Sequence, residues 1–221
     1  MNAANAAGFA NRSILFVLAA ALAAGLGLMA AQRVWTRPQA PAPMPAEALK
    51  TVRLFPAARA LPDYRLTLSD GSALTPATLR GHWTVVFLGF THCPDVCPTT
   101  LTELKQAQDT WSDLPAAIRP RVLFVSVDPE RDTPKIIGDY AHYFHADTLA
   151  ATVAEPGLQQ FAQALGLVYM KVPTEGSDYT MDHSATLIVL DPQGRQAGLI
   201  RPPLQPADIA ADLRLLTERA R

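Results

Sequence analysis

Residues 83–98 read WTVVFLGFTHCPDVCP and contain both cysteines of the chain. Trp83 to Phe90 is a continuous apolar run of strand length, which predicts a buried central strand. After the cysteines, Leu101, Leu104 and Trp111 recur at helical spacing. The stretch therefore predicts a strand followed at once by a helix, with the cysteines at the junction.

Cys93 and Cys97 are expected where a central strand ends, which is where open sheets usually form their sites. Pro98 suits the first turn of the following helix. A helix N-terminus presents free backbone N–H groups and the positive end of the helix dipole, and both stabilise a thiolate. These sulfurs are therefore predicted to be better nucleophiles and better metal ligands than an ordinary cysteine.

Two structural interpretations of the cysteine pair are less favourable. A disulfide between Cys93 and Cys97 would close a loop of about five residues and add only about 2 kcal/mol by the chain-entropy estimate. A closed zinc site needs four ligands, commonly two cysteines and two histidines. His142 and His145 are the available histidine pair, but their spacing places them more simply on the solvated face of a helix.

Outside this unit, the apolar pattern alternates between strand and helix spacing. The expected elements are a hairpin at 64–71, a strand at 121–127, a helix at 136–144 with Thr133 as cap and Pro134 just inside, a helix at 158–165 stopped by Gly166, strands at 168–172 and 185–190, a turn at 191–194, a strand near Gly198, and a closing helix through Ile209, Leu213 and Leu216. This order predicts an α/β layered domain with a mixed sheet.

Two thiolates and one imidazole form a donor set that suits copper. Soft sulfur ligands select copper(I), and copper(II) is the strongest binder of the divalent series. The imidazole must come from elsewhere in the sequence, and His183 stands apart from the other histidines, directly before the strand expected at Ala185. Taken alone, however, an isolated histidine is more often a surface or structural residue than a ligand.

The overall composition excludes one class of function. The 221 residues carry 19 basic and 20 acidic side chains, for a formal charge of −1. No basic run is long enough to form a nucleic-acid-binding face, so we expect no nucleic-acid partner.

The N-terminal residues predict a membrane anchor. Residues 14–31 (ILFVLAAALAAGLGLMAA) carry no charge and reach the lower end of the length that spans a bilayer. A cleaved signal peptide is the alternative, although its apolar region is usually shorter. We therefore divide the chain into a tail at 1–13, a transmembrane anchor or signal segment at 14–35, a proline-rich linker at 36–49 and a globular domain at 50–221.

Three blocks of this sequence resemble the Sco/SenC family of copper chaperones. They are FLGFTHCPDVCPTTL (87–101), FVSVDPERDTP (124–134) and YTMDHSATLIVLDPQG (179–194), in the family's order. The resemblance implies a thioredoxin-like fold with a mixed central sheet and flanking helices, and it matches Cys93, Cys97 and His183 to the family's copper ligands. Asp128 falls in the second block. Two roles are considered for it, one at the metal and one in fixing its loop.

The resemblance also implies a function and a location. It implies delivery of copper to the binuclear copper centre of cytochrome c oxidase, on subunit II, by a domain tethered outside a bacterial or mitochondrial inner membrane. No mitochondrial transit peptide is apparent in residues 1–13, which favours a single-pass protein of the bacterial inner membrane with its domain in the periplasm. Other periplasmic copper chaperones or thioredoxin-like reductants are possible further partners.

Two other functions are considered for the same cysteines. A thiol-disulfide oxidoreductase that reduces the oxidase cysteines, or acts in redox sensing, would use Cys93 and Cys97 as a redox pair. Three residues separate them instead of the usual two, which suits a metal better than fast exchange. A peroxidase is disfavoured, because Pro94 stands three residues before Cys97, where a hydroxyl donor is needed.

Overall fold

The strand Thr84–Gly89 (β4) lies at the centre of an eight-stranded sheet, and every one of its residues is buried. The computed structural model describes residues 16–29, 49–176 and 178–220. The strands run in the order β1-β10-β9-β4-β5-β6-β2-β3 across the sheet, and β7 pairs separately with β8. The strands are β1 (Arg53–Arg59), β2 (Leu66–Leu68), β3 (Ala73–Leu74), β4, β5 (Arg121–Ser126), β6 (Leu149–Thr152), β7 (Tyr169–Pro173), β8 (Tyr179–His183), β9 (Leu187–Leu190) and β10 (Gln196–Ile200).

The sheet is mixed, as predicted. β4, β5 and β6 are parallel, whereas β9 runs antiparallel to β4 and β10 antiparallel to β9. Parallel neighbours need a crossover connection, and helices supply both crossovers here. The helices of the domain are α2 (Val96–Asp109), α3 (Pro134–Phe144), α4 (Gly157–Leu165) and α5 (Pro206–Arg219), with a short 3-10 helix at Pro76–Leu79.

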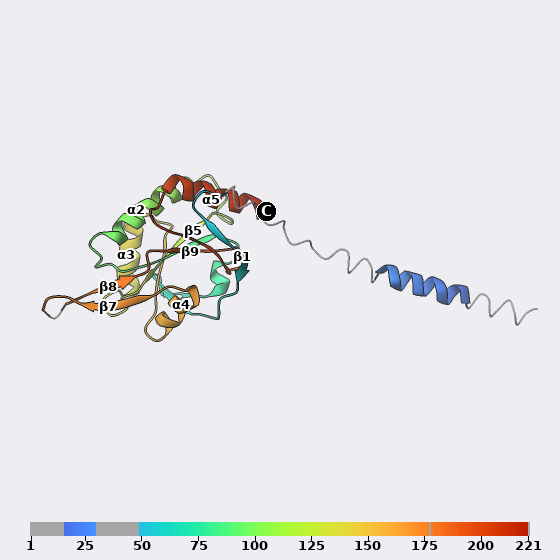
Figure 1. The fold of residues 1–221 in the computed structure, drawn as a ribbon, viewed down its shortest axis with the longest axis horizontal. Helices are drawn as coiled ribbons and strands as arrows, with labels where there is room; N and C mark the ends of the chain where they lie inside the picture. Colours follow the sequence, from blue (N-terminus) through green and yellow to red (C-terminus); the bar gives the residue numbers. More distant parts are fainter. Residues whose placement is uncertain (1–15, 30–48, 177, 221) are drawn as a thin grey trace, which may run out of the picture. The chain divides into compact units, whose positions relative to one another are not determined.

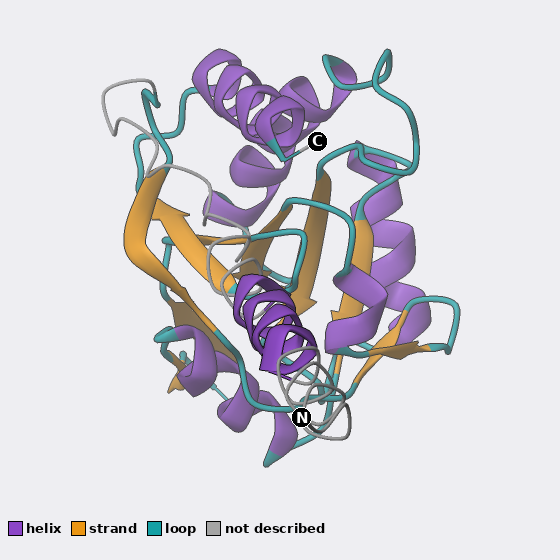
Figure 2. Cartoon of the chain, turned by 90° about the vertical axis from the view of Figure 1, so that its right-hand side faces the viewer, coloured by secondary structure: helices purple, strands orange, loops and turns teal. Residues whose placement is uncertain are grey.

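Helices cover both faces of this sheet. Figure 1 shows α2, α3 and α5 on one side and α4 on the other, and Figure 2 shows the strands enclosed between them. The indole N–H of Trp111, just after α2, donates to the Ala210 carbonyl of α5 at 3.1 Å and ties these two helices together. Phe87 and Phe124 are fully buried in adjacent strands, with ring centroids 5.8 Å apart. Apolar burial on both faces thus fixes the end of β4 and the start of α2, where the cysteines lie.

Most local signals of the sequence are confirmed. Thr133 caps α3 by accepting from the Ile136 N–H, and Gly166 ends α4 with a positive φ of 72°. The turn at Asp191 closes through a Gly194 N–H to Asp191 carbonyl bond of 2.8 Å.

Other local predictions need correction. The helix expected at 136–144 begins two residues earlier, at Pro134, and it buries Ile137 and Ala141 while Ile136 is 42% exposed. Trp111 lies just beyond the end of its helix.

Three strands were not predicted from the sequence, namely β1, β6 and β8. The last of these changes the setting of His183. The sequence predicted this histidine to precede a strand beginning at Ala185. Instead His183 is the last residue of β8, and the next strand, β9, begins at Leu187. Figure 1 shows the β7–β8 hairpin projecting from the side of the domain.

The N-terminal region is described only in part, and we treat it separately from the domain. Residues 16–29 form a helix with exposed side chains. Within the described residues, no helix has the combination of length and apolar character needed to cross a bilayer. The tail at 1–13, residues 14–15 and 30–35 of the expected anchor, and residues 36–48 of the expected linker lie outside the described residues.

Candidate metal centre

Cys97 is the second residue of α2 and is fully buried, whereas Cys93 lies in the preceding loop and is half-buried. Both are free cysteines. The backbone N–H of Cys97 points at Cys93 Sγ, with a nitrogen–sulfur distance of 3.4 Å. One backbone N–H at the start of α2 therefore faces the Cys93 sulfur. For Cys97 the predicted stabilisation of the thiolate is wrong, because burial raises the pKa of its thiol.

His183 meets the buried cysteine across 86 residues of sequence. Its Nε2 lies 3.5 Å from Cys97 Sγ. The other ring nitrogen, Nδ1, lies 3.2 Å from the Ser184 carbonyl oxygen, which can only accept a hydrogen bond. In the neutral ring the proton is therefore on Nδ1, and the Nε2 lone pair faces the sulfur. This is the tautomer and orientation that a metal ligand needs.

The surroundings of this pair are apolar. Two aromatic rings form T-shaped pairs with the imidazole, with centroid distances of 6.0 Å for Phe87 and 6.1 Å for Phe90. Burial lowers the pKa of His183, so the ring is neutral at neutral pH. Burial also raises the pKa of Cys97, and the neighbouring Cys93 thiol raises it further. A bound cation would offset the cost of ionising this buried thiol by pairing with the thiolate, as expected of a buried sulfur that serves as a metal ligand.

Gly89 leaves the space that the Cys97 sulfur occupies. A Cβ atom at this position would lie 2.8 Å from Phe124 Cε2, 3.0 Å from Phe87 Cε1 and 3.0 Å from Cys97 Sγ. A glycine inside a buried strand signals such a close approach. The sequence carries this signal as a single glycine within the apolar run 83–90.

Asp132 fixes the loop that leads to Cys93. Its buried carboxylate accepts from the Thr91 backbone N–H at 3.0 Å, from the Thr91 hydroxyl, and from the Ser126 hydroxyl at 2.6 Å. The sequence carries no indication of this role, because the two bonds to Thr91 join residues 41 positions apart.

Both carboxylate oxygens of Asp128 have hydrogen-bond partners of their own. One of its oxygens accepts from the Tyr179 hydroxyl at 2.8 Å, and the other accepts from Arg131 Nε. This pairing favours the loop-fixing alternative for Asp128 over a direct role at a metal.

The remaining histidines have separate settings. The His82 ring is buried, with Nδ1 2.9 Å from the Arg119 carbonyl. His92 lies beside Thr91 and is exposed. His145 accepts from the Asp147 N–H at 3.1 Å, and His142 lies in the last turn of α3.

As the side chains stand, no group of three or more His, Cys, Asp or Glu residues in the described part of the chain is arranged to hold a metal ion. The structure thus brings Cys97 to His183 and Cys93 to the backbone of Cys97, so the three predicted residues are linked in pairs. Binding one ion with all three requires these side chains to rearrange. A shallow cavity of about 370 Å³ opens on the His183 side, lined by Val168, Tyr169, Met170, Asp182, His183 and Ser184.

Comparison with known proteins identifies the family of this chain. The SCO1/SenC family model matches residues 54–218. The chain belongs to the SCO1/SenC family. A relative from Stutzerimonas stutzeri is 36% identical over 156 residues, which are 70% of this chain and 75% of that protein. The human mitochondrial protein SCO1 homolog is 31% identical over 151 residues, which are 68% of this chain and half of that protein.

Solved structures of the family agree with the fold. The copper-bound structure of Bradyrhizobium japonicum ScoI is 34% identical and superposes with a TM-score of 0.65, covering 71% of this chain and 98% of that chain. The fold is therefore the thioredoxin-like fold of Sco proteins, as predicted.

Proposed function

We propose that this chain is a membrane-tethered copper chaperone that holds one copper ion with Cys93, Cys97 and His183. The observation that carries the proposal is the 3.5 Å approach of His183 Nε2 to Cys97 Sγ, with the Nε2 lone pair directed at that sulfur. Two sulfurs and an imidazole are a donor set suited to copper in either oxidation state. The copper-bound Sco structure of a 34% identical relative supports the same cargo.

The different exposures of the two cysteines suit the transfer of a cargo ion. Cys97 is buried and fixed at the start of α2, so it retains its position while the ion is exchanged. Cys93 is half-buried in a loop, so an incoming thiolate can reach its side of the ion first. The copper ion is then released as ligands of the acceptor replace first Cys93, then His183 and finally Cys97.

We propose the binuclear copper centre of cytochrome c oxidase subunit II as the acceptor. Other periplasmic copper chaperones or thioredoxin-like reductants would serve as donors of copper or electrons. The uncharged run at 14–31 supports a single-pass anchor in a bacterial inner membrane, and the proline-rich residues after it support a spacer to a periplasmic domain.

A transfer experiment tests delivery. The purified chain loaded with copper would be mixed with the reduced, copper-free soluble domain of subunit II, and the absorption of the binuclear centre would be followed. We expect the centre to form from the wild-type chain and to form poorly from the Cys93→Ser variant. Formation at the same rate from free copper and from the loaded chain would contradict a chaperone role.

A thiol-disulfide oxidoreductase is the second candidate, favoured by the half-buried Cys93 at a helix N-terminus. Against fast exchange, burial raises the pKa of Cys97, which slows its action as the resolving thiolate. Incubating the reduced, metal-free chain with oxidised subunit II distinguishes the two functions. Rapid reduction of the acceptor disulfide would favour the oxidoreductase.

A further inference from the structure

The β7–β8 hairpin is a two-stranded sheet separate from the central sheet, yet its last residue is His183. An isolated pair of strands is only marginally stable in water. At its base the hairpin is closed by the Ser184 N–H to Val168 carbonyl bond of 2.9 Å. The position of His183 therefore depends on what holds the rest of the hairpin.

The loop between β5 and α3, residues 127–133, holds the far end of β8 through Tyr179. The Tyr179 hydroxyl donates to Asp128 at 2.8 Å. The Arg131 guanidinium lies 3.8 Å from the centroid of the Tyr179 ring, donates to the Tyr179 carbonyl at 3.1 Å and pairs with Asp128. Burial and the Asp128 bond raise the pKa of Tyr179 to about 12, so its hydroxyl keeps the proton that it donates.

The same loop also reaches the other strand of the hairpin. Lys171 of β7 lies 3.8 Å from the Tyr179 centroid, so two cations contact the ring. Lys171 also pairs with Glu130 of the loop at 2.7 Å, but both side chains are largely exposed, so this pair contributes little. The buried carboxylate of Asp128, only 2% exposed, is the firmer attachment.

Residues 127–133 also hold the cysteine loop, through the bonds from Asp132 to Thr91. Ser126, the last residue of β5, links the two attachments, because its hydroxyl accepts from the Asp128 N–H at 3.0 Å and donates to Asp132 at 2.6 Å. One short segment is thus bonded to the residues leading to Cys93 and to the strand leading to His183.

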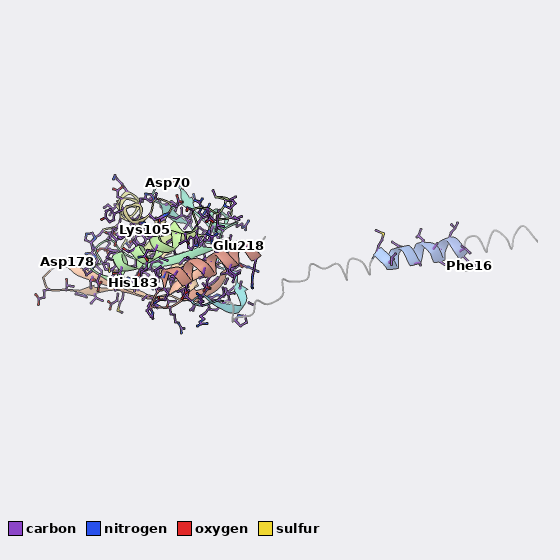
Figure 3. All side chains as sticks on the ribbon, turned by 90° about the horizontal axis from the view of Figure 1, so that it is seen from above. Phe16, Asp70, Lys105, Asp178, His183 and Glu218 are labelled. Carbon is purple, nitrogen blue, oxygen red and sulfur yellow. The ribbon has the colours of Figure 1, made fainter. Side chains whose placement is uncertain are left out.

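We propose that residues 127–133 act as a brace that sets the position of His183 relative to Cys97, with Tyr179 as the positioning residue at its histidine end. Tyr179 and His183 are four residues apart on one strand, about 13 Å at strand rise. Figure 3 shows Asp178, next to Tyr179, toward the outer end of the hairpin and His183 closer to the body of the domain. Tyr179 acts on copper only through the imidazole, and this part of the inference rests on the proposed function.

A double-mutant cycle on the full-length chain tests the brace. Tyr179→Leu removes the ring and the hydroxyl, Tyr179→Phe removes only the hydroxyl, and each is combined with His183→Ala. Lys135→Gln is the matched control, because it breaks an exposed ion pair with Asp139 outside the loop. Copper(II) affinity, the thiolate-to-copper absorption spectrum and hydrogen exchange of the metal-free chain would be measured for each.

We expect Tyr179→Leu to weaken copper(II) by about 10- to 100-fold, the usual cost of losing a residue that orients a ligand, and to shift the absorption. Tyr179→Phe should lose less copper(II) affinity than Tyr179→Leu, and Lys135→Gln should lose none. In the His183→Ala background, the Tyr179 variants should have no further effect. An equal loss in both backgrounds would overturn the proposal, because Tyr179 would then act on the fold in general. Should Tyr179→Leu fail to fold, Tyr179→Phe decides by the same criterion.

Hydrogen exchange separates this inference from the proposed function. We expect faster exchange in β7 and β8 in the metal-free Tyr179→Leu chain than in the wild type or the Lys135→Gln control. That result would support the brace even if the wild-type chain bound no copper, which would overturn the proposed function alone. Unchanged exchange of the hairpin would overturn the brace.

Discussion

The chemistry of the site at the scale of single residues depends on one pair of atoms, Cys97 Sγ and His183 Nε2, 3.5 Å apart. The Ser184 carbonyl directs the imidazole by accepting from Nδ1, and the start of α2 directs Cys93 through the Cys97 N–H. The donor atoms are thus oriented by backbone groups, which no side-chain substitution removes. What substitutions can change is the space around the sulfur and the loops that carry it.

Replacing Gly89 by alanine tests the space beside the sulfur. The new Cβ would collide with Phe124, Phe87 and the Cys97 sulfur, so we expect about 1–3 kcal/mol of destabilisation and weaker copper binding. Denaturant unfolding and copper titration would measure the two effects.

Gly138→Ala is the matched control for that variant. Its Cβ would lie 2.6 Å from the Ser69 Cβ, a similar collision between α3 and the residue after β2, away from the cysteines. We expect comparable destabilisation with copper affinity unchanged. Equal loss of copper binding in both variants would show that Gly89 acts only through overall stability.

At the scale of elements, the loop between β4 and α2 is held by a buried carboxylate. Replacing Asp132 by asparagine leaves one acceptor oxygen where two now serve Thr91 and Ser126. We expect about 1–3 kcal/mol of destabilisation and faster hydrogen exchange in residues 91–95, with exchange in β9 unchanged. Thr91→Val, which removes one hydroxyl donor to Asp132 and leaves the backbone N–H bond in place, should have the smaller effect, and the reverse order would contradict the assignment.

The elements also show how far sequence reasoning extends. The β4–α2 unit, the caps of α3 and α4 and the turn at Asp191 were predicted, because apolar period and local turn chemistry determine them. β1 contains Pro56 and lies at the sheet edge, β6 is a short run with two alanines, and β8 is half polar, so their pairing depends on neighbours distant in sequence.

The residues of the candidate site also differ in whether the sequence predicts them. Cys93 and Cys97 could be predicted from the strand-to-helix junction that carries them. His183 was matched to them only by the family resemblance, because no spacing rule relates residues 86 positions apart. Asp132 and Tyr179 gave no signal at all, since their roles consist of contacts between a loop and segments more than 40 residues away.

At the scale of the whole molecule, the start of the domain is fixed to its last helix. The buried carboxylate of Asp212 in α5 accepts from the backbone N–H groups of Lys50, Thr51 and Val52, at 2.8–3.1 Å. A single residue thus joins the first described turn of the domain to its C-terminal helix. This attachment lies where the proposed spacer would reach the domain.

Removing that attachment should be costly. Asp212→Ala would leave the N–H groups without their shared acceptor, and we expect a loss of about 2–4 kcal/mol in the free energy of unfolding. Asp208→Ala is the control, because it removes only the exposed ion pair with the Lys50 side chain. Equal effects of the two variants in denaturant titrations would contradict a role for the buried carboxylate.

The measurement that tests the central claim most directly is a copper titration of the reduced chain, wild type beside His183→Ala. Stoichiometry and thiolate-to-copper(II) absorption would be recorded together. We predict a single tightly bound ion in the wild type, with weaker affinity and an altered spectrum in the variant, because Nε2 faces Cys97. Identical affinity and spectrum in both proteins would remove His183 from the site and contradict the account.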